Sequence, residues 1–460
     1  MPKPSDKFAP YAVVLLILGG LARFPMMILL RHTSFLVYCD NSYLQAGQAM
    51  LQLDFHALGM RTPVYPFLLA LCGLRPGWIW FAQSLLGMAA SLMIFDMVFR
   101  RTGHALYALL VGLVCSLTPE VLTYESSVMS EALTSFLLVS SFWLITREET
   151  AGEPKRLYLF ALGSTIALTA LTRPLMVCLV PVYYCFLVPP WPPGRILQRE
   201  FLKRTLYFAL PATLGIMGWC GFNYVVNGYF SPSTRSGGNL MDQVDAYVEL
   251  APERFANLRD AWIHSRQRVN GGSVNVCAIG VYGDVVAEMQ RRTGKTEAQT
   301  SHEFAALALY LQVHHPLLCL RRAEQGWMQF WGAPTRDEIE WPQGNTFSLG
   351  EFLMTLIGFL IRQVEAVFLV LALLSIPCVL FYQKVFTRIE YLAFAVTLWV
   401  SAFAAFTEFG ENRRFCVPFY MLIVYILMTR AWVWITAPGG PTPPTVGGQR
   451  CSPDGTEAPD

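Results

Sequence analysis

The sequence predicts an all-α polytopic membrane protein with about ten transmembrane helices. Of its 460 residues, 54% are hydrophobic and only 14% are charged, whereas a soluble globular protein carries about 25% charged residues. Several apolar runs are also longer than the roughly 17 uncharged residues that cross a hydrocarbon core. A membrane β-barrel would instead show alternating strands.

The predicted spans are placed by these apolar runs. The first, from Phe8 to Leu30, is too long for a signal-peptide core and has no small-residue cleavage site, which favours a retained helix. In order, the ten segments are 8–30, 77–99, 104–118, 130–146, 157–172, 174–190, 205–226, 363–383, 390–407 and 415–435. Residues 1–226 therefore form a first membrane domain, and 351–435 supply the C-terminal membrane helices.

The distribution of basic residues predicts the orientation of these spans. With the N-terminus inside, thirteen Lys and Arg residues fall in inside segments and three in short outside turns, which is the bias that the positive-inside rule requires. Two long segments then lie outside, residues 31–76 with short interfacial helices and a larger region at 227–350. The Pro- and Gly-rich tail 436–460 is predicted to be disordered and cytoplasmic.

Composition also excludes several functions. The net charge of +2 gives no basic field for nucleic acid. The eleven cysteines include no CxxC pair, which argues against a zinc site or a disulfide framework. No phosphate-binding GxxxxGK[ST] loop occurs. The sequence shows no required cofactor, and it leaves a requirement for a divalent metal open.

Asp40 is the first candidate site residue. It precedes a run in which Tyr43, Ala46 and Gly47 recur at helical spacing, one apolar face of an interfacial helix. Asp40 either caps that helix or, shielded at the membrane surface, has a raised pKa and accepts a proton from a hydroxyl. Arg61 follows in RTPVYP, where it either binds a phosphate through its planar fork or extends toward water at the head-group level.

Glu131 lies at the outer end of the fourth predicted span. A carboxylate there is either a functional group or a charge that complements the N-terminal end of a helix dipole. Arg173 occupies a tight outer turn before a proline, and Arg413 and Arg414 occupy the last outer turn beside acidic residues, where local ion pairs are the alternative. Together, these arginines place several cations on one membrane face, an arrangement that suits an anionic lipid head group.

The order of these residues resembles one enzyme superfamily. A carboxylate after the first span (Asp40), an aromatic residue three positions on (Tyr43), a basic residue before a proline (Arg61) and a carboxylate at the fourth span (Glu131) resemble the superfamily C membrane glycosyltransferases. The branch that contains protein O-mannosyltransferases and lipid A aminoarabinose transferases is the most similar. The resemblance covers roughly residues 8–190, with weaker matches in HHPLLCL and ENRRFCVP.

The resemblance implies an inverting hexosyl- or pentosyltransferase. Such enzymes take a sugar from a polyprenyl-phosphate donor and transfer it, outside the cytoplasm, to a lipid, glycan or protein acceptor. Asp40 would activate the acceptor, and Glu131 would shape the site. The donor contacts would be Tyr43, Arg61, Arg173, Arg413 and Arg414. The chain would be a multi-pass protein of a bacterial inner membrane, with its site facing the periplasm or exterior. Many relatives carry two adjacent acidic residues in the first loop, whereas this chain has Asn41 at the second position.

Two alternatives stay open. An O-antigen ligase or polymerase would use a polyprenyl-diphosphate donor and the arginines of the 227–350 region. A non-enzymatic transporter would need polar residues at mid-bilayer and repeats between its halves. The ordered early motif favours the transferase over both.

Overall fold

The computed structural model describes residues 5–32, 41–149, 156–187, 199–273, 279–332, 349–380 and 385–436, and all regular structure within them is helical. The first half of the chain forms the helices α1 (Ser5–His32), α2 (Asn41–Gln52), α3 (Phe55–Leu58), α4 (Val64–Leu71), α5 (Pro76–Thr102), α6 (Ala105–Leu117), α7 (Pro119–Glu125), α8 (Glu131–Glu149), α9 (Arg156–Thr172), η1 (Pro174–Cys178), α10 (Leu179–Leu187) and α11 (Arg199–Asn227).

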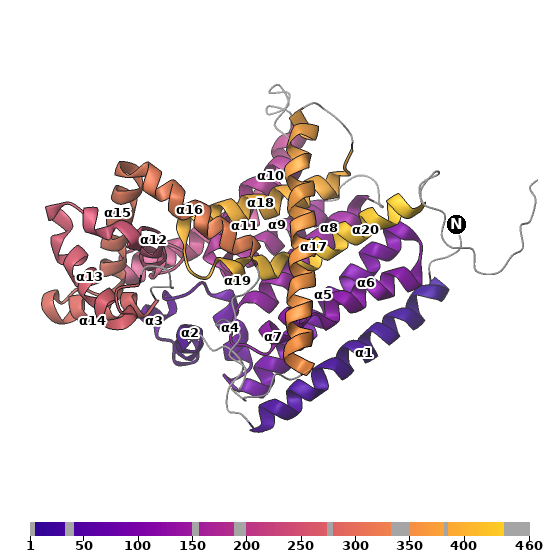
Figure 1. The fold of residues 1–460 in the computed structure, drawn as a ribbon, viewed down its shortest axis with the longest axis horizontal. Helices are drawn as coiled ribbons and strands as arrows, with labels where there is room; N and C mark the ends of the chain where they lie inside the picture. Colours follow the sequence, from indigo (N-terminus) through magenta and orange to yellow (C-terminus); the bar gives the residue numbers. More distant parts are fainter. Residues whose placement is uncertain are drawn as a thin grey trace, which may run out of the picture.

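The second half begins with shorter helices and ends with longer ones. Its elements are α12 (Ser236–Val244), η3 (Asp245–Leu250), η4 (Glu253–Phe255), α13 (Ala256–Asn270), α14 (Ile279–Thr293), α15 (Glu297–His314), α16 (Pro316–Trp331), α17 (Leu349–Leu380), α18 (Arg388–Thr407), α19 (Asn412–Cys416), η6 (Val417–Phe419) and α20 (Tyr420–Thr436). The helices α12 to α15 gather at one end of the molecule (Figure 1).

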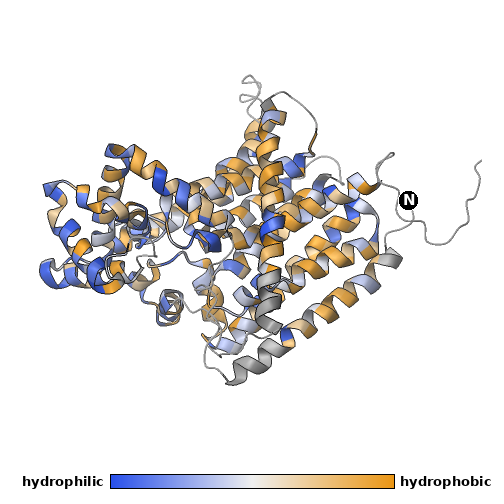
Figure 2. Cartoon of the chain, viewed as in Figure 1, coloured by the Kyte–Doolittle hydropathy of each residue, from blue (hydrophilic) through white to orange (hydrophobic). Residues whose placement is uncertain are grey.

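Hydropathy separates the same two regions. The long helices are mostly apolar, whereas α12 to α15 are strongly mixed with hydrophilic residues (Figure 2). Many apolar side chains of the long helices point outward, among them Ile17 on α1, Leu214 on α11 and Val370 on α17. Large exposed apolar faces are unfavourable in water, so these helices are suited to contact lipid.

The predicted number of ten spans is not supported. Within the described ranges, five helices are long and apolar enough to cross a membrane, and a sixth span results if the bent pair α6 and α7 is counted as one. Three further apolar helices have 10–17 residues, and α8 is not among the candidate spans. Each of the ten predicted segments does contain helix, so the error lies in equating an apolar helix with a full crossing.

Two prolines begin new helices at the boundaries of predicted spans. The segment predicted at 104–118 ends at Leu117, and Pro119 then begins α7 after a bend of 52°. The segment predicted at 174–190 begins with Pro174 in a short 3₁₀ helix before α10. Proline lacks an N–H and suits a first helical turn, so each one starts a new helix rather than extending the previous one.

A small apolar cluster fixes the helices of the first loop. Tyr43 of α2 and Tyr65 and Leu69 of α4 are buried together with side chains of α5 and α8, including Ile79 and Leu133. Helix α2 can approach α4 closely because residue 47 is glycine. A Cβ at that position would lie 3.3 Å from the Cβ of Leu69 on α4. The helix predicted at this position is therefore present, and its Tyr43 face packs inward.

The region between α11 and α17 has its own core. Met241, Trp262, Val285, Phe304 and Leu311 are all buried within it. The segment after α11 is tied to the first loop by two hydrogen bonds, because Thr234 donates its N–H to the carbonyl of Gly59 and Ser233 donates its hydroxyl to that of Met60. This lobe, residues 231–332, therefore borders the loop that carries Arg61.

Candidate functional site

Glu131 is the centre of the candidate site. It opens α8, its side chain is fully buried, and its Oε1 accepts a hydrogen bond of 3.1 Å from Nη2 of Arg173. The same oxygen lies 2.7 Å from Nε of Arg414. Arg414 also forms an ion pair of 2.5 Å with Glu411. One carboxylate thus joins the corner between α9 and η1 to helix α19, two segments that are far apart in the sequence.

Arg61 and Tyr43 form a second part of the site. The Arg61 guanidinium lies 4.6 Å from the centre of the Tyr43 ring, a cation–π contact. Its Nε also donates a hydrogen bond of 2.7 Å to the hydroxyl of Ser42. The first turn of helix α2 therefore contacts Arg61. The sequence predicted that Arg61 lies in the same loop as this helix, but it did not predict which residues Arg61 contacts.

Hydrogen bonds between neighbouring residues join the two parts. The hydroxyls of Tyr43 and Ser130 lie 3.3 Å apart, and Ser130 immediately precedes Glu131. On the other side, Thr62 donates its hydroxyl to the carbonyl of Thr172 at 3.0 Å. Because these residues flank Arg61, Glu131 and Arg173, the predicted side chains Tyr43, Arg61, Glu131, Arg173 and Arg414 belong to one site.

Glu408 also belongs to this site, although the sequence indicated it only as a local ion-pair partner of the neighbouring arginines. It follows α18, and its partly buried carboxyl feels the positive charges of Arg414, Arg173 and Arg61. Burial, helped by the nearby Glu411 carboxylate, outweighs those arginines and raises the pKa of Glu408 to about 7. The signal available in the sequence was its position three residues before Glu411, in the same short segment as Arg414.

Arg413 does not join its neighbour. It forms ion pairs of 2.7 Å with Glu365 on α17 and 2.9 Å with Glu120 on α7. Successive residues of a helix point about 100° apart, so the two arginines of α19 serve different surroundings. Of these two predicted donor contacts, the structure therefore brings only Arg414 to Glu131.

Asp40, the predicted base, lies outside the described residues. The chain is described again from Asn41, the first residue of α2. The residues that follow, Ser42 and Tyr43, contact Arg61 as described above. The predicted tail at 436–460 likewise lies outside the described part of the chain from residue 437 onward.

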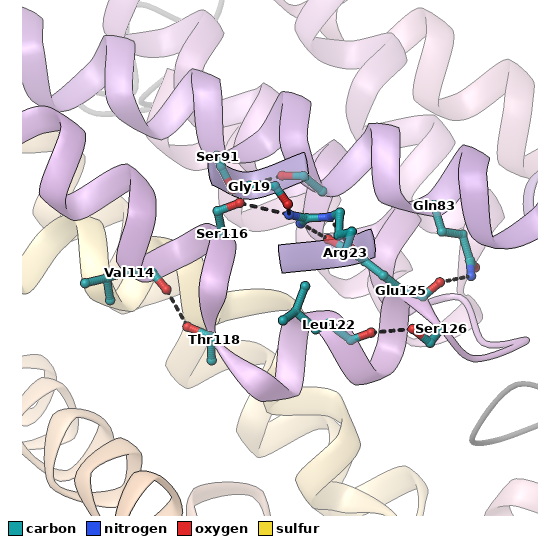
Figure 3. A network of polar contacts seen from close by, with 11 residues as sticks. Gly19, Arg23, Gln83, Ser91, Val114, Ser116, Thr118, Leu122, Glu125 and Ser126 are labelled. Carbon is teal, nitrogen blue, oxygen red and sulfur yellow. Dashed lines mark hydrogen bonds and ion pairs between the residues drawn. The ribbon is translucent and has the colours of Figure 1, made fainter. Parts of the chain in front are cut away.

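A second buried network lies beside this site, and its centre is an ion pair between Arg23 and Glu125. Arg23 of α1 donates to both carboxylate oxygens of Glu125, at 2.5 and 2.7 Å, and to the carbonyl of Gly19 and the hydroxyl of Ser116 (Figure 3). Both side chains are almost completely buried. Arg23 and Glu125 are 102 residues apart, so no local spacing in the sequence predicts that they pair with each other.

Asp96 and Arg100, at the C-terminal end of α5, form an ion pair within a single helix. Asp96 accepts two hydrogen bonds from Arg100, four residues on, and one from Trp143. This pairing along one helix follows from the i, i+4 spacing alone. In the part of the chain that the structure describes, no group of three or more His, Cys, Asp or Glu is arranged to hold a metal ion.

Comparisons with known proteins give no relative. No protein family, curated protein or solved structure matches the chain.

Proposed function

We propose that the chain is a membrane glycosyltransferase that moves a sugar from a polyprenyl-phosphate donor to an acceptor hydroxyl outside the cytoplasm. The observation that carries this proposal is the grouping of three arginines, Arg61, Arg173 and Arg414, around Glu131 and Tyr43 at one end of the long apolar helices. The superfamily C resemblance of the same residues supplies the reaction.

The charge balance of the site suits a phosphodiester. Three guanidinium groups face the three carboxyl groups of Glu131, Glu408 and Glu411. Burial raises the pKa of Glu408 to about 7, well above the usual range of a glutamate, and this favours its neutral form. The site then carries a net positive charge, which the single negative charge of a polyprenyl-phosphate sugar would neutralise.

Unfilled hydrogen-bonding positions support a ligand of this kind. Nη1 of Arg173 and Oε2 of Glu131 are buried, and no hydrogen bond reaches either atom from the described residues. Buried polar atoms normally have a partner, and a guanidinium without one costs free energy. A phosphate oxygen would accept from Arg173, and a sugar hydroxyl would donate to Glu131.

The proposed reaction is a displacement at the anomeric carbon. The acceptor oxygen forms a bond to that carbon from one face while the bond to the phosphate oxygen breaks on the other, so the configuration inverts. Asp40 takes the proton of the acceptor hydroxyl, and the lipid phosphate leaves with the bonding electron pair. Arg61, Arg173 and Arg414 stabilise the negative charge that develops on the phosphate.

The structure gives less support to a ligase that would use the arginines of the late lobe. Arg235, Arg266 and Arg268 are each paired there with at least one carboxylate, Glu297, Asp245 and Asp284 respectively. Arg259 and Arg292 are paired as well. Arginines committed to internal ion pairs have fewer donors for a diphosphate.

A transporter is favoured by one observation, the buried Arg23–Glu125 pair near the membrane helices, since ionisable groups there often mark a solute path. This pair is fully engaged, however, in hydrogen bonds to Gly19, Ser116 and itself. A transport role would require those contacts to open during a cycle. We therefore place the pair in the framework of the protein rather than on a solute path.

The proposal is tested by a transfer assay on the full chain in membranes. Labelled sugars linked to polyprenyl phosphate are supplied as a panel, together with the matching diphosphates. We expect transfer from at least one monophosphate donor and its loss in Arg173→Gln. Arg259→Gln serves as the matched control, because it removes an arginine ion pair from the lobe surface. Transfer from diphosphates alone would support the ligase, and solute uptake without transfer would support the transporter.

A further inference from the structure

We propose that Glu125, Gln83 and Tyr65 form a positioning network that holds the Glu131 end of the site in register with the Arg61 end. This inference rests on the proposed transferase function, and it assigns a role to residues that contact neither the donor nor the acceptor in that proposal. Three successive sets of buried contacts connect the two ends of the site.

The first link anchors the segment that leads to Glu131. Arg23 grips the Glu125 side chain at the end of α7 with two parallel hydrogen bonds, a geometry that fixes orientation as well as position. Helix α5 passes close by at Gly87, where a Cβ would lie 1.7 Å from Oε1 of Glu125. No larger side chain fits between α5 and this carboxylate, so its location is tightly constrained.

The second link is Gln83 on α5, which is completely buried. Its amide nitrogen donates to the carbonyls of both Glu125 and Ser127, each at 2.8 Å. Figure 3 shows Gln83 directed toward the Glu125 and Ser126 end of α7. One side chain therefore clamps the backbone just before Ser130 and Glu131. Both amide hydrogens are used, which leaves the amide oxygen to accept from elsewhere.

The third link runs from that oxygen to the Arg61 side. Tyr65 of α4 donates its hydroxyl to Oε1 of Gln83 at 2.9 Å. The Tyr65 ring meets the Tyr43 ring edge to face, with centroids 4.9 Å apart, and Arg61 lies over Tyr43. The Tyr43 hydroxyl in turn contacts the hydroxyl of Ser130, in the segment that leads to Glu131. The contacts form a closed circuit between the two halves of the site.

A shared cavity strengthens the connection. Glu125 and Glu131 both line a small internal space, together with Gly87, Ala132 and Val417. The unsatisfied Oε2 of Glu131 is buried in the same region. A shift of α7 would therefore alter the surroundings of Glu131 directly. In a site whose geometry must be held to within an ångström, a displacement of that size lowers the rate by up to about 100-fold.

Tyr65→Phe is the sharpest test, because it removes one hydroxyl and keeps the ring against Tyr43. Tyr183→Phe is the matched control, since Tyr183 is equally buried and its hydroxyl pairs with Ser141 away from the site. We expect Tyr65→Phe to lower kcat/KM for the donor by about tenfold, whereas Tyr183→Phe leaves it unchanged. Equal kinetics in the two variants would overturn the proposal.

Amide hydrogen exchange on the purified full chain separates this proposal from the proposed function. We expect Tyr65→Phe to speed exchange at 126–131 as well as at 57–66, and Tyr183→Phe to change neither segment. If the wild-type chain transfers no sugar, the transferase proposal fails while the exchange result still decides the coupling. Unchanged exchange at 126–131 contradicts the network. Faster exchange at 126–131 with unaltered transfer kinetics would show that Tyr65 is coupled to this segment but does not position the site for transfer. That result would also overturn the inference.

Discussion

Glu131 and Arg414 lie 2.7 Å apart, although one begins α8 and the other belongs to α19, near the C-terminal end of the chain. Their contact brings the C-terminal membrane helices to the site that the first half of the chain builds. A donor bound there would contact both halves of the protein. The neighbouring residue Arg413 faces away from that site, which allows the two adjacent arginines to be tested against each other.

Arg413→Gln should mainly lower the stability of the protein, whereas Arg414→Gln should mainly weaken donor binding. Loss of Arg413 leaves the buried carboxylates of Glu365 and Glu120 without their cation, and breaking a buried pair in this way costs about 3–5 kcal/mol. We expect a marked fall in thermal stability with normal kinetics in the folded fraction. Arg414→Gln should mainly raise the donor KM. Thermal unfolding and donor titration on both purified variants measure the two effects, and the reverse pattern would contradict the site described here.

Arg61→Lys should weaken donor binding although it keeps the charge. Lysine has neither the planar fork nor the face that lies over Tyr43. We expect the donor KM to rise by about tenfold, equivalent to roughly 1.4 kcal/mol. Tyr43→Phe keeps a ring beneath Arg61 and loses the contact with Ser130, so it should be milder. A lysine variant with wild-type KM would show that Arg61 acts only as a distant charge.

Donor binding should weaken as the pH rises through about 7. Below that value Glu408 holds its proton and leaves Arg61, Arg173 and Arg414 free of its charge, whereas above it the carboxylate competes with the donor phosphate. The phosphodiester itself does not titrate in this range. The kcat/KM profile for the donor therefore falls on its alkaline side, and Glu408→Gln should remove that fall. An unaltered profile in this variant would exclude Glu408 as the titrating group.

Asp40→Asn should abolish transfer and preserve donor binding. The amide matches the carboxylate in size but cannot take the acceptor's proton. Membrane insertion and donor affinity are the controls, because a base is not required for either. If the variant inserts normally and transfers at the wild-type rate, Asp40 is not the base, and the Asn41 position offers no substitute.

The helical membrane architecture was predictable because it depends on hydropathy alone. Every apolar run predicted as a span contains helix. The number of crossings was not predictable in the same way, since it depends on where helices stop. Pro119 begins α7 directly after one predicted span, at a bend of 52°, and Pro174 begins another span with a 3₁₀ turn.

The site was predictable in its residue types and less so in its partners. Tyr43, Arg61, Glu131, Arg173 and Arg414 do meet, as their common location outside the membrane suggested. The divergence of Arg413 depends on the rotation of one short helix. The pairing of Arg23 with Glu125 depends on the tertiary packing of α1 against α6 and α7. No sequence spacing encodes either feature.

The most direct test of the account locates the donor head group. A polyprenyl monophosphate with a photoreactive group beside its phosphate is bound to the purified full chain and activated, and the labelled peptides are identified. If the donor binds at this site, we expect adducts near Arg61, Arg173 or Arg414 that unlabelled lipid phosphate competes away and that Arg173→Gln abolishes. Competable adducts confined to residues 231–332, with none at these arginines, would contradict it.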